Sequence, residues 1–95
     1  MDEHEKSLKT AWRAAARNEA RLAFPLKASL MAELFAAVES ALVNSACDHS
    51  LAATERWLDS HKVPRQETVA WLKANGGYCD CEVVANAADH WEQNR

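Results

Sequence analysis

The sequence contains few residues that interrupt helices, with two glycines and two prolines among 95 residues. Because glycine and proline mark most turns, their scarcity predicts long helices joined by short connections. Apolar residues never run for about 18 positions, so we expect no transmembrane helix. The N-terminal residues MDEHEKSLKT are charged and precede no apolar run, so we expect no secretory signal.

Cysteine is also scarce, and its number is odd. Two of the three cysteines, Cys79 and Cys81, are separated by one residue, which is not the arrangement of a disulfide framework. We therefore expect a reduced, cytoplasmic protein. The net charge of −3 is unevenly distributed. Residues 1–27 carry six basic and four acidic side chains, a net +2, whereas residues 28–95 carry five and ten, a net −5.

Residues 1–23 are predicted to form an N-terminal helical arm, with a helix over 3–23 that ends before Pro25. Its apolar side chains lie at helical spacing and form a thin stripe of Leu8, Trp12, Ala15 and Leu22. Its basic side chains recur every four residues and share one face, namely Lys9, Arg13, Arg17 and Arg21. The stripe needs a partner, either the protein's own domain or a second copy, so a homo-oligomer through this helix is the expected assembly.

Residues 24–95 are predicted to be a single helical domain with helices over 28–44, 49–61, 64–75 and 81–93. The last segment also contains Val83 and Val84, whose β-branched side chains favour strands, so a short strand is an alternative to the helix there. Gly76 and Gly77 end the fourth helix, and one of them is expected at positive φ. The predicted core consists of Leu34, Phe35, Val38, Leu42, Leu51, Leu58 and Leu72. The predicted fold class is all-α, a compact bundle of about four short helices preceded by a long N-terminal helix.

Two short motifs, Cys47-Asp48-His49 and Cys79-Asp80-Cys81, each stand where a helix is predicted to begin. A structural zinc ion takes four thiolate or imidazole ligands in a tetrahedron. The motifs supply that number and kind of ligand through Cys47, His49, Cys79 and Cys81. One zinc ion bound there would tie the two halves of a helical hairpin together.

Acidic residues accompany the candidate ligands, and Asp48, Asp80 and Glu82 are expected to cap helices or to hydrogen-bond the ligands. The one-residue spacing within each pair is shorter than structural zinc sites usually have. Glu82 and His90 are therefore substitute ligands. The alternative without metal is that the cysteines are small buried side chains beside two aspartate caps.

A second function class is a thiol or redox enzyme that uses Cys79 or Cys81 as the nucleophile and His49 as the base, since a helix N-terminus lowers a thiol pKa. No phosphate loop or cofactor motif accompanies these residues, and a small helical body leaves little room for a pocket of about 300 Å3. We therefore do not expect an enzyme. A nucleic-acid accessory that binds through the basic arm is a third hypothesis, weakened because no aromatic residues alternate with the basic ones.

The segments CDHSLAATERWL and VAWLKANGGYCDCEVVANA closely resemble a small bacterial family of domains of unknown function. The family signature is Cys-Asp-His-Thr-Leu, then Trp/Phe-Leu, then Gly-Gly-Phe/Tyr-Cys-Asp-Cys-Glu and an asparagine, here Asn86. The resemblance covers about residues 24–87, with local departures at Lys27 and Lys62. It implies that the cysteines, the histidine and the aspartates belong to one motif, and it implies no activity. Together these observations favour a small structural or interaction module whose two motifs tie the fold together.

Overall fold

The computed structural model describes residues 3–95, with side chains from residue 8 onward; the first two residues of the predicted arm lie outside this range. The described chain is helical and contains no strand, which confirms the all-α prediction. Its elements are α1 (Glu3–Leu22), α2 (Ala28–Asn44), α3 (Ala52–His61), α4 (Arg65–Ala74), α5 (Asp80–Glu82), the π-helical turn η1 (Val83–Ala87) and α6 (Ala88–Asn94). Within this range no helix is long and apolar enough to cross a membrane.

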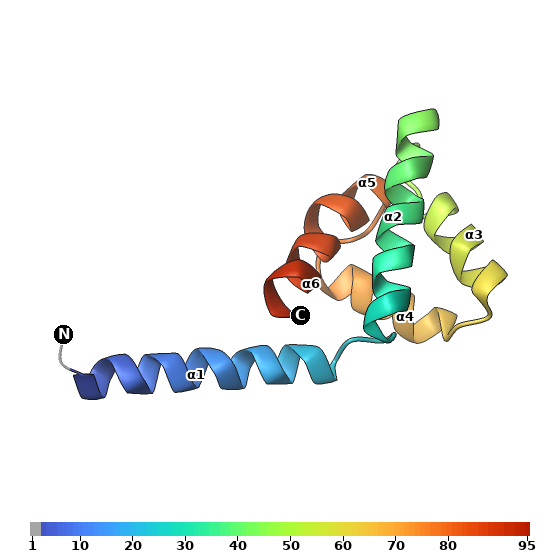
Figure 1. Cartoon of the computed structure of the whole chain (residues 1–95). Helices are drawn as coiled ribbons and strands as arrows, with labels where there is room; N and C mark the ends of the chain where they lie inside the picture. The colour runs from blue at the N-terminus through green and yellow to red at the C-terminus, as the bar shows by residue number, and fades with distance from the viewer. Residues whose placement is uncertain (1–2) are drawn as a thin grey trace.

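Helix α2 lies at the centre of the helical body, with α3 on one side and α5 and η1 on the other (Figure 1). Helix α1 extends away from this body and meets it at α6, where the Arg21 side chain donates a hydrogen bond from Nε to the backbone oxygen of Asn94 at 2.9 Å. The long dimension of the molecule, 52 Å against 25 and 19 Å, follows from this projecting helix. The division into an arm and a domain near residue 23 stays a prediction.

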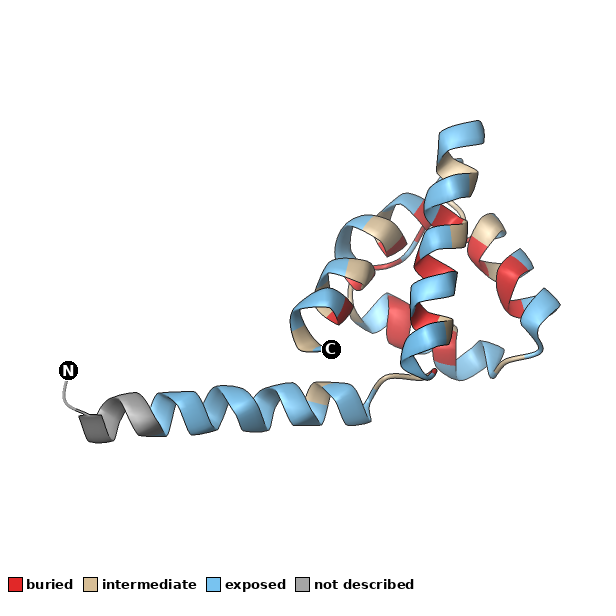
Figure 2. Ribbon diagram, in the orientation of Figure 1, coloured by how far each residue is buried: buried red, intermediate tan, exposed pale blue. Residues whose placement is uncertain are grey.

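Buried apolar side chains from α2, α3, α4 and η1 form one core. Figure 2 marks the buried positions along these helices in red. Six of the seven predicted core residues are buried, and Leu42 is half-buried against the core. Large aromatic side chains complete it, and Phe35 and Trp91 pack with their ring centroids 5.5 Å apart. The pattern of apolar residues in α2 therefore predicted the buried face of that helix correctly.

The end of α4 explains the double glycine. Gly76 has φ +84°, in the left-handed region, and Gly77 donates its N–H to the oxygen of Leu72 at 2.7 Å. This hydrogen bond satisfies a carbonyl group of the last turn of the helix, as in other helices that end with a glycine. Asn86 in η1 donates from its amide to the oxygen of Gly76 at 3.0 Å. The predicted glycine at positive φ is confirmed, and the asparagine of the family signature fixes the same turn.

Two predicted helices differ from the observed ones. The third helix begins at Ala52 rather than residue 49, because the Asp48 carboxylate accepts hydrogen bonds from the backbone and hydroxyl of Ser50 and so holds a turn there. The last segment, residues 80–94, is helical throughout but includes the π-helical turn η1. The alternative of a short strand at Val83 and Val84 is therefore not observed.

Candidate metal centre

The three cysteines meet where α2 ends and α5 begins. Cys47 lies in the connection after α2, Cys79 immediately precedes α5 with an extended backbone, and Cys81 is inside α5. Their three Sγ atoms all lie within 4.8 Å of one another, and the Sγ atoms of Cys79 and Cys81 are 3.3 Å apart. Two thiolates at about 2.3 Å from a tetrahedral zinc ion stand about 3.8 Å apart, so this group, the three-cysteine cluster, matches the size of a metal site.

The three-cysteine cluster lies at the surface of the body rather than in its core. Cys79 is buried, Cys47 is half-buried and Cys81 is exposed. None of the three is in a disulfide bond. An ion in solution can therefore reach the cluster without opening the fold, whereas the buried sulfur of Cys79 holds one side of it in a fixed place.

The thiols are not equivalent as acids. The pKa of Cys47 is lowered, chiefly because the backbone N–H of Cys81, and then that of His49, stabilises its thiolate. The pKa of Cys81 is raised to about 12, because hydrogen bonds with the side chains of Cys79 and then Cys47 favour its protonated form. Cys47 therefore loses its proton before Cys81. A bound metal ion would displace the remaining protons, since cysteine binds metals as the thiolate.

Asp80, the residue between the two clustered cysteines, ties their turn to α3. Its backbone N–H donates to the oxygen of Ser50 at 2.8 Å. Its buried carboxylate accepts from the backbone N–H groups of Ala53 at 3.0 Å and Thr54 at 3.1 Å, and from the Thr54 hydroxyl at 2.8 Å. These are the free donors at the start of a helix, so Asp80 caps α3 from a distant part of the chain. Asp80 therefore has the expected capping role, but it caps α3 and not α5, the helix that it begins.

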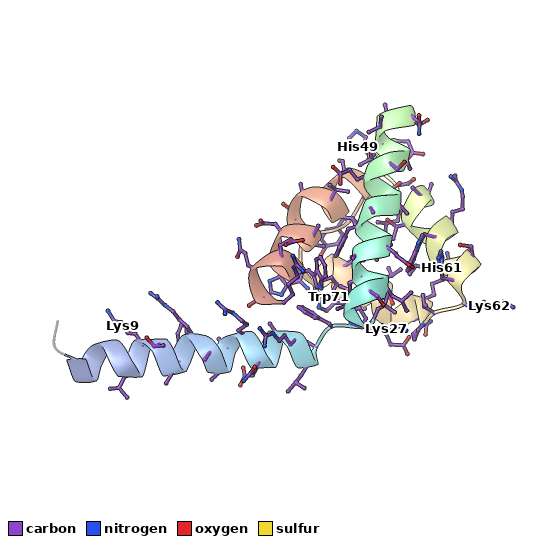
Figure 3. The ribbon with its side chains drawn as sticks, viewed as in Figure 1. Lys9, Lys27, His49, His61, Lys62 and Trp71 are labelled. Atoms are coloured by element: carbon purple, nitrogen blue, oxygen red, sulfur yellow. The ribbon has the colours of Figure 1, made fainter. Side chains whose placement is uncertain are left out.

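The remaining predicted site residues do not join the three-cysteine cluster. His49 is exposed with φ 65°, and Figure 3 places it beside the end of the body where α2 terminates. Asp48 is held by Ser50, whose side chain and then backbone donate to its carboxylate and lower its pKa. Glu82 is half-buried in α5. Among the described residues, the donor atoms close enough to share one ion are the three cysteine sulfurs.

An open pocket of about 430 Å3 adjoins the cluster, although so small a body was expected to leave little room for one. Its lining includes Cys47, Asp48, Asp80 and the exposed Arg56 of α3, together with the last turn of α2. No sequence motif pointed to Arg56. No role for Thr54 and Ser50 was predicted from the sequence either. Each of them supports the site indirectly, by donating hydrogen bonds to an aspartate of one of the two motifs.

Fold and site together define a class, the small all-helical proteins in which two turns gather cysteines able to hold a metal ion. The chain belongs to the family described as "Protein of unknown function (DUF2695)", whose model matches residues 34–86 and so includes both motifs. An uncharacterized protein of Mycobacterium bovis and one of Mycobacterium tuberculosis are each 30% identical to it over 79 residues, covering 83% of this chain and 80% of the relative. No solved structure matches the chain significantly. The resemblance noted in the sequence is thereby confirmed.

Proposed function

We propose that the protein is a small cytoplasmic structural and interaction module in which Cys47, Cys79 and Cys81 hold one zinc ion. The observation that carries the proposal is the grouping of the three Sγ atoms within 4.8 Å of one another. Thiolates are preferred ligands of zinc in structural sites. A reducing compartment fits this function, because the cysteines must stay free of disulfides to bind the ion.

The bound ion would cross-link the chain. Cys47 stands before α3, and Cys79 and Cys81 follow α4, so the ion closes a loop that contains both helices. Closing a long loop removes conformational freedom from the unfolded chain and thereby stabilises the fold. If the ion is instead released on unfolding, the stabilisation follows from mass action and is about 4 kcal/mol when free zinc is a thousandfold above Kd.

His49 stays the predicted fourth ligand. Asp80 and Asp48 are engaged by Thr54 and Ser50, so neither carboxylate is free to turn toward an ion. His49 follows Cys47 at the same one-residue spacing that separates Cys79 from Cys81. Its exposed side chain can rotate, and a neutral imidazole completes a tetrahedral site with three thiolates.

Titration of the metal-free protein with Co2+ tests the proposal, because sulfur-to-cobalt absorption reports the number of thiolate ligands. One equivalent should give the spectrum of a tetrahedral site with three thiolates, and zinc should displace the cobalt. Replacing Cys79 by serine should abolish this spectrum. His49→Ala should keep the thiolate bands and alter the visible ones, whereas His61→Ala, the matched control on α3, should alter neither. Absence of any thiolate band in the native chain would refute the proposal.

A thiol or redox enzyme is the second candidate, supported by the 3.3 Å approach of the Cys79 and Cys81 sulfurs and by the adjoining pocket. Two observations count against it. The raised pKa of Cys81 makes it a poor nucleophile, because the thiolate is the reactive form. Cys79, the other predicted nucleophile, is buried, so a substrate has little access to its sulfur. If no metal binds and the native thiols react with iodoacetamide faster than free cysteine does at neutral pH, this candidate replaces the first.

A further inference from the structure

Helix α1 leaves large apolar side chains in solvent. The exposed fractions are 57% for Leu8, 72% for Trp12 and 88% for Leu22. The other three tryptophans of the chain are buried in the core. In Figure 2 the described part of α1 is exposed almost along its whole length. A stripe of this kind on a projecting helix marks an interaction surface.

The stripe points away from the body of its own chain. Arg21 lies on the basic face of α1 and reaches the backbone of Asn94 in α6, so the basic face turns toward the body. Figure 3 shows Lys9, on the same face, pointing to that side of the helix. At about 100° per residue, Leu8 and Leu22 fall on the opposite side of the helix from the basic residues. The chain's own body therefore does not cover the stripe.

We propose that α1 pairs with α1 of a second copy, antiparallel and about a twofold axis at Ala15. Leu8 and Leu22 each stand seven residues from Ala15, so this register places Leu8 of each copy against Leu22 of the other. The small side chain of Ala15 lets the two helices approach closely where they cross. A twofold axis makes the same patch complementary to itself, as in most homodimers.

Charge favours the antiparallel arrangement. The body of each copy, residues 28–95, carries a net charge of −5 and is attached to the C-terminal end of its arm. A parallel pair would bring two acidic bodies together, whereas an antiparallel pair separates the two arm ends at Leu22 by about 21 Å along the helix axis, beyond the screening length of about 8 Å at physiological salt. Antiparallel helices also oppose their dipoles favourably.

A second copy fits the stripe better than a lipid surface does. Glu19 lies seven residues after Trp12 and so falls within the stripe. Its carboxylate would have to enter the apolar layer of a membrane, at considerable cost. In the helix pair it lies level with the partner's small Ala11, and because a partner helix covers only a narrow strip, the long Glu19 side chain can extend past it to water. With few large side chains, the interface stays under about 1,200 Å2, the size of weak and reversible associations.

Sedimentation of the full-length protein over a range of concentrations tests this pairing. The native chain should form dimers in the micromolar range, with a blue shift of tryptophan emission that is absent in Trp12→Phe. Leu8→Glu and Leu22→Lys should each raise the dimer Kd at least about tenfold, because each removes two leucine contacts. Arg17→Ala, on the opposite face, should leave the Kd unchanged, and circular dichroism should show every variant folded.

The doubly substituted chain, Leu8→Glu with Leu22→Lys, decides the register. In the antiparallel pair each introduced glutamate faces an introduced lysine of the other copy, so dimers should return. In a parallel pair like charges would meet, and the double variant would be weaker than either single one; that result overturns the proposal. A native chain that stays monomeric, or whose Trp12 is shielded only when anionic phospholipid vesicles or duplex DNA are added, overturns it as well.

Discussion

The carboxylate of Asp80 accepts two hydrogen bonds from Thr54, one from the backbone N–H at 3.1 Å and one from the hydroxyl at 2.8 Å. Both residues are buried, and 26 positions separate them in the sequence. The bonds hold the turn that carries Cys79 and Cys81 against the start of α3, which lies directly after the turn that carries Cys47. The protein itself therefore brings the cysteines together, and a metal ion would find its ligands already grouped.

Replacing Asp80 should destabilise the fold strongly. Asp80→Ala leaves two backbone N–H groups and the Thr54 hydroxyl without their acceptor, so we expect a loss of about 2–4 kcal/mol in the free energy of unfolding. Asp89→Ala, an exposed aspartate in the first turn of α6, should cost much less. Urea denaturation of the metal-free proteins measures both. Equal losses in the two variants would show that Asp80 does not tie the turns together.

The buried face of α2 and α3 should dominate stability. Leu34 and Leu58 are 0% and 1% exposed, so Leu34→Ala and Leu58→Ala should each cost about 2–5 kcal/mol. Leu22→Ala makes the same chemical change at a side chain that is 88% exposed in the single chain, and at concentrations where the chain is monomeric we expect less than about 0.5 kcal/mol there. Thermal and chemical unfolding provide the comparison. If Leu34→Ala were as mild as Leu22→Ala, the assignment of the core would be wrong.

The turn at Asp48 should respond to acid. Hydrogen bonds from Ser50 lower the pKa of Asp48 below its ordinary value of 3.8. A carboxyl group with a lowered pKa stabilises the fold above its ordinary pKa, and this contribution disappears as the pH falls through the folded value. Asp48→Asn should therefore be less stable than the native protein at neutral pH, and the difference should vanish well below pH 3.8. A stability difference that is the same at both pH values would contradict this sign.

Local sequence patterns predicted the parts of the fold that depend on local physics. The spacing of Leu34, Phe35 and Val38 identified the inner face of α2, and the glycine pair identified the end of α4. The start of α3 was misplaced because it depends on contacts outside the helix. Its N–H groups are capped by Asp80 from another part of the chain, and the positive φ of His49 places a turn where a helix was expected.

Only part of the candidate site could be predicted, again because the rest depends on contacts between distant parts of the chain. Repetition of Cys-Asp-x suggested that the two motifs meet, and the three sulfurs do lie together. The direction of the His49 side chain depends on a left-handed backbone that the sequence does not reveal. The pocket beside Cys47 and the position of Arg56 also follow from how α2 and α3 pack, which no single motif encodes.

Zinc content measured by elemental analysis on protein purified without chelators tests the central claim most directly. Native protein should contain about one zinc ion per chain, and Cys79→Ser should contain almost none while circular dichroism shows that it remains helical. The matched control is Ser45→Ala, in the same connection as Cys47; it changes no cysteine and should keep its zinc. Native chain that stays free of metal after incubation with zinc, with all three thiols still open to alkylation, would contradict the account.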